Sequence, residues 1–149
     1  MDNLVLQHEN IGIVRTLHNI DKVIFRTINE KLAVLKVSHV QALILIFLFE
    51  HTGEEVFQKT LEKEFGLSNP TVTASVKSME AKKLVKKIKS EKDGRYYALI
   101  LENSGKELAP KCSEIYEEIE NGLKKILTTE QLECLSELNS KVSSLQDKY

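Results

Sequence analysis

A cluster of basic side chains in the middle of the chain has the residue types that bind phosphate groups. Residues 68–95 contain eight lysine or arginine side chains and three acidic ones, a local net charge of +5. The whole chain of 149 residues has a formal net charge of −1. A basic segment within such a chain is the electrostatic signature of a nucleic-acid site. The side chains expected to contact the polyanion are Lys77, Lys82, Lys86, Lys87, Lys92 and Arg95.

Small polar side chains stand at the start of this segment. Ser68 and Pro70 are typical of the first turn of a helix. Hydroxyl and amide groups in that turn can hydrogen-bond base edges or phosphates, and the N–H groups there favour a phosphate. We therefore expect DNA contacts from Ser68, Asn69, Thr71 and Thr73.

Turn residues stand at the other end of the segment. Lys92, Asp93, Gly94 and Arg95 have the chemistry of a tight turn, so the Arg95 side chain should project from a hairpin. An arginine in that position can enter the minor groove of DNA, where negative potential is concentrated. Asp93 and Gly94 are expected to shape the turn rather than to touch DNA.

The surrounding segments predict helix, turn, helix and hairpin in immediate succession. A short helix is expected over about 58–65, ended by Gly66, and a second one from Ser68 to about 82. The β-rich runs 84–88 and 96–101 predict a hairpin, which a short strand near Val56 can join. This is the order of a helix-turn-helix with a wing, in which one helix fits the major groove.

Longer helices are predicted on both sides of this unit. Apolar residues recur at three- and four-residue spacing over about 9–36, 104–127 and 130–147. Capping boxes are expected at Ser38 and Thr128, and the helix from Ser38 to about Glu50 is apolar on nearly every side, as in a core helix. Long striped helices have few partners within one chain, so we favour a homodimer interface over an intramolecular core.

The expected fold is therefore α+β and mainly α-helical. Residues 1–149 are predicted to form a single domain, with a winged helix-turn-helix lobe at 38–102. Dimerisation helices are expected at 1–37 and 103–149. A two-fold symmetric dimer of this kind reads an inverted repeat in double-stranded DNA.

The sequence of the predicted winged helix-turn-helix resembles the MarR family of dimeric bacterial transcription regulators. The similarity is carried by residues 68–73, 79–85 and 93–95, with Leu101 and Gly105. The resemblance implies that the helix after Ser68 reads the major groove, that Arg95 contacts the minor groove and that Asp93 holds the wing loop. It also implies a sequence-specific regulator; a repressor is the first interpretation, and an activator stays open.

The resemblance further implies release from DNA by a small aromatic or anionic ligand. The candidate pocket walls are His18, His39, Phe47 and Tyr116. Several positions depart from the family pattern. Ala74 and Ser78 stand where arginine is common, Lys83 replaces a common glycine, Glu102 replaces a threonine, and Glu62 replaces a small residue between the two helices of the motif.

Other classes of function have little support in the sequence. No nucleophile elbow, Walker loop, dinucleotide fingerprint or HExxH motif is present, so no enzyme activity and no cofactor are expected. The four histidines lack metal-ligand spacing, so no metal is expected. Cys112 and Cys134 lie on or near apolar stripes and are expected to be buried and unreactive.

The longest apolar run, residues 42–49, is far shorter than the roughly 20 residues of a membrane span. With no signal peptide in the sequence, a cytoplasmic protein without a membrane partner is expected. The alternative that stays open is a winged-helix module that binds proteins and not DNA. Such a module has no need of the basic segment and its arginine.

Overall fold

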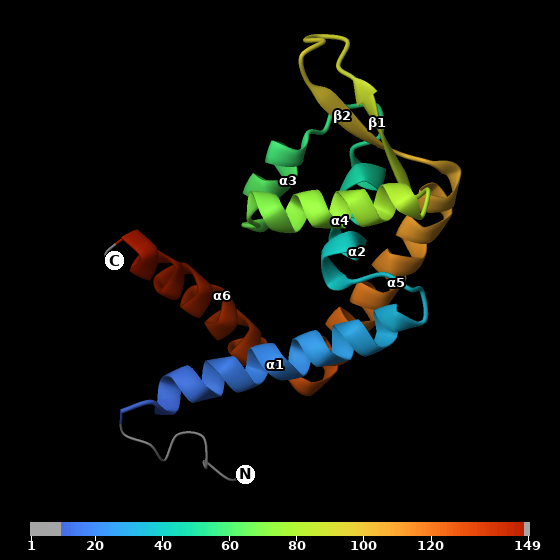
Figure 1. Cartoon of the computed structure of the whole chain (residues 1–149). Coiled ribbons are helices and arrows are strands. Elements are labelled where there is room, and N and C mark those ends of the chain that lie inside the picture. Colours follow the sequence, from blue (N-terminus) through green and yellow to red (C-terminus); the bar gives the residue numbers. More distant parts are fainter. Residues whose placement is uncertain (1–9, 148–149) are drawn as a thin grey trace. The chain divides into compact units, whose positions relative to one another are not determined.

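The computed structural model describes residues 10–147, and its order of elements confirms the α+β, mainly helical prediction (Figure 1). Helices α1 to α4 precede a hairpin of β1 and β2, and α5, α6 and a short 3-10 helix, η2, follow it. Their bounds are α1 Gly12–Ala33, α2 His39–Glu50, α3 Gln58–Phe65, α4 Asn69–Ala81, β1 Val85–Lys89, β2 Tyr97–Leu101, α5 Asn103–Ile126, α6 Thr129–Ser143 and η2 Ser144–Asp147.

Two helix ends differ from the sequence prediction. Helix α1 ends at Ala33 and not near residue 36, because Lys36 has a left-handed backbone with φ of +59°. Its expected start at residue 9 lies outside the described residues. Helix α6 ends at Ser143, and the chain continues as the 3-10 helix η2.

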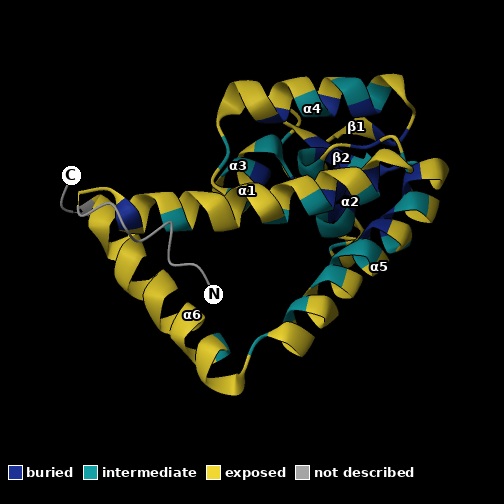
Figure 2. Cartoon of the chain, turned by 90° about the horizontal axis from the view of Figure 1, so that it is seen from below, coloured by how far each residue is buried: buried dark blue, intermediate teal, exposed yellow. Residues whose placement is uncertain are grey.

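The contacts divide the described chain into two units, 10–115 and 116–147, with the boundary inside α5. The first unit contains α1 to α4, the hairpin and the first half of α5. The second contains the rest of α5, α6 and η2, and α6 has no buried residue (Figure 2). The lobe boundaries predicted at 38 and 102 stay a prediction.

Helix α2 lies in the core of the first unit, as its apolar sequence predicts. Ala42, Ile44 and Leu45 are completely buried within it. Leu61 of α3 and the inner face of α4, with Val72, Val76 and Met79, belong to the same core. Burial of one such large aliphatic side chain contributes about 1.5–3 kcal/mol, so this core fixes the placement of α3 and α4.

Local hydrogen bonds confirm the predicted helix starts. Ser38 and Gln41 form a reciprocal capping box, with the Gln41 N–H donating to Ser38 Oγ at 3.2 Å. Thr128 and Gln131 form the second box. Gly66 ends α3 with a φ of +62°, a conformation that glycine adopts without steric cost.

The hairpin is antiparallel, and its register pairs Val85 with Leu101 and Lys89 with Tyr97. Val56 joins it through an isolated bridge to Leu99, in which the Leu99 N–H donates to the Val56 carbonyl at 2.7 Å. The short strand predicted near Val56 is therefore reduced to this one bridge, and the sheet itself has two strands. Gly105 permits α5 to pass directly over the Leu84 backbone, because a Cβ at position 105 would collide with the Leu84 carbonyl oxygen.

The two cysteines differ in environment. Cys112 is completely buried, and burial raises the pKa of its thiol to about 11. The expectation of burial is wrong for Cys134, which is exposed because α6 buries none of its residues. Within residues 10–147, no helix is long and apolar enough to cross a membrane, and no cluster of three potential metal ligands occurs.

Candidate nucleic-acid interface

The first turn of α4 carries the small polar side chains that the sequence singled out. Ser68 is the N-cap, and its Oγ accepts a hydrogen bond from the Thr71 N–H at 3.3 Å and lies 2.9 Å from Thr71 Oγ1. Because the opposite face of α4 is buried, Asn69, Thr73 and Lys77 are exposed. The helix therefore presents amide, hydroxyl and ammonium groups along one accessible face.

Two side chains of α3 orient this face. Gln58 Nε2 donates to Thr73 Oγ1 at 3.1 Å, and Asn69 Nδ2 donates to Glu62 Oε2 at 3.4 Å. Since the Thr73 oxygen accepts from Gln58, its hydroxyl hydrogen is available to donate outward. Sequence reasoning noted Glu62 only as a departure from a family pattern and missed Gln58.

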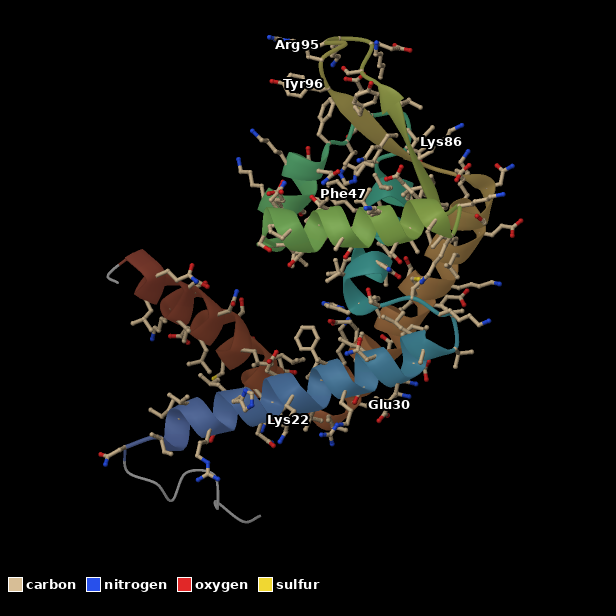
Figure 3. All side chains as sticks on the ribbon, viewed as in Figure 1. Lys22, Glu30, Phe47, Lys86, Arg95 and Tyr96 are labelled. Atoms are coloured by element: carbon tan, nitrogen blue, oxygen red, sulfur yellow. The ribbon has the colours of Figure 1, made fainter. Side chains whose placement is uncertain are left out.

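The hairpin tip holds Arg95 in a defined orientation (Figure 3). Arg95 Nη2 donates to Asp93 Oδ2 at 2.8 Å, and Arg95 Nε and its backbone N–H donate to Asp93 Oδ1, each at 3.1 Å. These hydrogen bonds lower the pKa of the Asp93 carboxyl and raise the pKa of Arg95. The Arg95 side chain is still 82% exposed and lies 5.8 Å from the Tyr96 ring centroid, so this paired arginine remains accessible.

The structure does not require glycine at position 94, although the sequence predicts that Gly94 shapes the turn. A Cβ added to it would meet open space, and its φ lies outside the left-handed region. The wing turn therefore depends on Asp93, whose backbone carbonyl also accepts from the Tyr96 N–H at 3.1 Å. Lys92 lies on the same turn and is exposed.

The predicted lysines do not share one surface. Lys87 lies 3.8 Å from the Glu80 carboxylate, whereas Lys86 points to the opposite face of the hairpin (Figure 3), as strand alternation requires. Lys82 Nζ donates to the Lys36 carbonyl at 2.8 Å and to Gln41 Oε1 at 3.3 Å. Lys82 therefore ties the end of α4 to the start of α2, a role the sequence did not indicate.

An open groove of about 550 Å³ lies between the start of α3 and the hairpin. Its walls combine aromatic rings with cations, a combination that suits a sugar-phosphate backbone. The sequence prediction omitted most of these residues because they lie outside α4 and the wing turn, although the aromatic residues close to basic ones at 57–59 and 95–97 could have indicated them. The lining residues are Phe57, Gln58, Lys59, Thr60, Lys87, Arg95, Tyr96 and Tyr97.

The four predicted ligand-pocket residues are not brought together. His18 lines a shallow depression on α1 with three polar neighbours. The His39 ring contacts Phe25 edge-on at 4.7 Å, and its partial burial lowers its pKa. Phe47 instead stacks on His51 at 3.9 Å. Tyr116 belongs to the second unit.

Comparisons with known proteins give a consistent set of similarities. A model described as the MarR family matches residues 35–95, from the residues before α2 to the wing tip. The chain is similar to Staphylococcus aureus MepR in its DNA complex, with 23% identity and a TM-score of 0.82 over 93% of this chain and 99% of that chain.

Two further solved structures show the same fold. The transcription regulator MarR from Oenococcus oeni has 22% identity and a TM-score of 0.75, covering 89% of this chain and 98% of that chain. The transcriptional regulator BldR from Sulfolobus solfataricus has 24% identity and a TM-score of 0.73, covering 91% and 95%. A comparison with curated protein sequences gives no significant match.

Proposed function

We propose that this chain is a transcription regulator of the MarR family that binds double-stranded DNA sequence-specifically; the match of the family model to residues 35–95 and the fold shared with solved regulators support this. One observation carries the proposal. The exposed polar face of α4 and the Asp93-held Arg95 of the wing are the two elements that a winged helix-turn-helix inserts into DNA grooves. A solved relative, S. aureus MepR, is described in complex with DNA.

In this proposal α4 lies in the major groove. Asn69, Thr73 and Lys77 face the bases or the adjacent phosphates, and Arg95 enters the neighbouring minor groove. Lys59 and Lys87, on the two sides of the groove between α3 and the wing, neutralise phosphates of the strand between them. Lys82 is left out of this contact set because its ammonium group is bound to the protein.

A homodimer is the assembly that we propose. Large apolar side chains are exposed on α1, where Ile13 is 74% exposed, and in the second unit. Exposed apolar surface of this extent is typical of an interface. Light scattering at micromolar concentration should give twice 17.0 kDa. The residues concerned are Ile13, Val14, Leu17, Ile20 and Val23 of α1 and Ile126, Leu135, Leu138, Val142 and Leu145 of the second unit.

Repression, release by a small aromatic or anionic ligand and a cytoplasmic location remain predictions within this proposal. The dispersed positions of His18, His39 and Phe47 offer no single ligand site within the first unit. A thermal-shift screen with phenolic acids tests whether any ligand binds, since a ligand of the folded state raises the melting temperature.

Selection of duplexes from a random library tests the proposed function. The parent protein should enrich an inverted repeat with half-sites about one helical turn apart. Thr73→Ala should reduce discrimination between the enriched and a scrambled duplex, whereas Lys87→Ala should weaken both equally. If no duplex is enriched, sequence-specific binding is refuted; if the protein also fails to bind random duplex at low salt, a protein-binding winged helix becomes the better interpretation.

A further inference from the structure

A carboxylate outside the hairpin anchors the base of the wing. Glu55 lies between α2 and α3, next to the Val56–Leu99 bridge. Its Oε2 accepts a hydrogen bond from Ser90 Oγ, and its Oε1 accepts one from the Glu91 N–H, both at 2.7 Å. Short bonds to an ionised acceptor are about twice as strong as neutral ones. Both oxygens of Glu55 therefore bind the segment where β1 leads into the wing turn.

The Ser90 hydroxyl relays this contact into the turn. Ser90 is only 6% exposed, and its Oγ accepts from the backbone N–H groups of Lys92 at 3.2 Å and Asp93 at 3.1 Å. Because Ser90 donates its single hydrogen to Glu55, both oxygen lone pairs face these amides. Asp93 in turn holds the Arg95 guanidinium. An uninterrupted chain of hydrogen bonds thus joins Glu55 to the arginine.

We propose that Glu55 is a positioning residue for the wing, which sets the orientation of Arg95 through Ser90 and Asp93. The inference rests on the proposed DNA-binding function. An isolated two-stranded hairpin is marginally stable in water, so the orientation of this tip depends on contacts at its base. A carboxylate at the edge of a basic surface weakens phosphate attraction, so Glu55 can favour DNA binding only through geometry.

Removal of the Glu55 side chain leaves Ser90 without its acceptor and frees the turn. If the wing is then in its binding orientation in about a tenth of the molecules, the apparent affinity for DNA falls about tenfold. The loss exists only while Arg95 is present, because Arg95 is the group that is being positioned. A general loss of structure would instead weaken binding in every background.

Glu55→Ala is compared with Glu54→Ala, which removes the same charge one residue earlier from an exposed side chain. Both are made in the parent and in Arg95→Ala. Affinity is measured by fluorescence anisotropy with a duplex that the parent protein has selected from a random library. We expect Glu55→Ala to weaken binding about tenfold in the parent and less than about twofold in Arg95→Ala. Glu54→Ala should not weaken binding in either background.

Hydrogen exchange of the Glu91, Lys92 and Asp93 amides gives a second readout that needs no DNA. Glu55→Ala should accelerate exchange at these amides and leave the amides of α4 unchanged. The inference is overturned if these amides keep the parent's rates, if the variant binds as tightly as the parent, or if the loss persists in Arg95→Ala. A parent that selects no duplex refutes the proposed function instead, and the exchange rates still decide whether Glu55 anchors the wing.

Discussion

Replacement of Arg95 by alanine separates DNA binding from folding. Arg95 makes three hydrogen bonds to one neighbouring carboxylate and no described contact with the core. Its side chain is 82% exposed, and an ion pair in that setting contributes little to stability. Arg95→Ala should therefore leave helix content, dimer mass and the free energy of unfolding essentially unchanged.

The effect on DNA binding should be larger. One groove contact of this kind contributes about 1–3 kcal/mol, so the affinity for the selected duplex should fall about 5- to 150-fold. The structure favours the upper part of that range, because Asp93 orients the guanidinium before DNA arrives and less side-chain entropy is lost on binding. A narrow A·T-rich minor groove beside each half-site should give the largest difference between parent and variant.

Fluorescence anisotropy at several salt concentrations measures this effect. Lys87→Ala is the matched control, since Lys87 lines the same groove but lies 3.8 Å from Glu80 and should meet only phosphate. It should weaken all duplexes alike and reduce the slope of log affinity against log salt by about one. If Arg95→Ala binds the selected duplex as tightly as the parent at every salt concentration, the wing does not engage DNA and the reasoning fails.

Three further predictions concern folding and reactivity. Lys83→Gly should raise the free energy of unfolding by about 0.5–1 kcal/mol, because Lys83 has a left-handed φ of +59° that favours glycine. The melting temperature should rise as well. Urea unfolding measures the change, and a variant less stable than the parent would contradict the prediction. Burial lowers the pKa of His39 below its ordinary value of 6.5, so the unfolded chain binds more protons at that position. Stability should fall as the pH drops from 7.5 through the folded pKa, and His39→Gln should reduce this pH dependence; an unchanged pH dependence would show that His39 is not responsible. A thiol reagent at pH 7.5 should label exposed Cys134 and spare buried Cys112 until the chain unfolds, and equal labelling rates would contradict this.

The sequence was sufficient for the features that depend on local chemistry. Ser38, Thr128 and Gly66 mark helix ends because capping oxygens and a left-handed glycine act within a few residues. The helical stripes and the hairpin were predictable for the same reason. The left-handed backbone of Lys83 was not predicted, although the glycine that is common at this position in the family is a signal for it.

The sequence was not sufficient for features that depend on contacts between distant segments. Lys82 counts as one more cation in a basic run, and only the fold shows its ammonium group bound to the Lys36 carbonyl, 46 residues away. Glu55 and Ser90 are likewise 35 residues apart and carry no motif. Cys134 lies near an apolar stripe, but a stripe does not show whether its own chain covers it.

Hydroxyl-radical footprinting of the selected duplex tests the central claim most directly. The parent protein should protect two half-sites related by two-fold symmetry, about one helical turn apart, with further protection in the minor groove on their outer sides. Arg95→Ala should lose the outer protection and retain the inner one, because α4 is unaltered. A parent protein that protects no part of the duplex, or a footprint that Arg95→Ala leaves unchanged, would contradict the assignment of α4 and the wing as a DNA-reading surface.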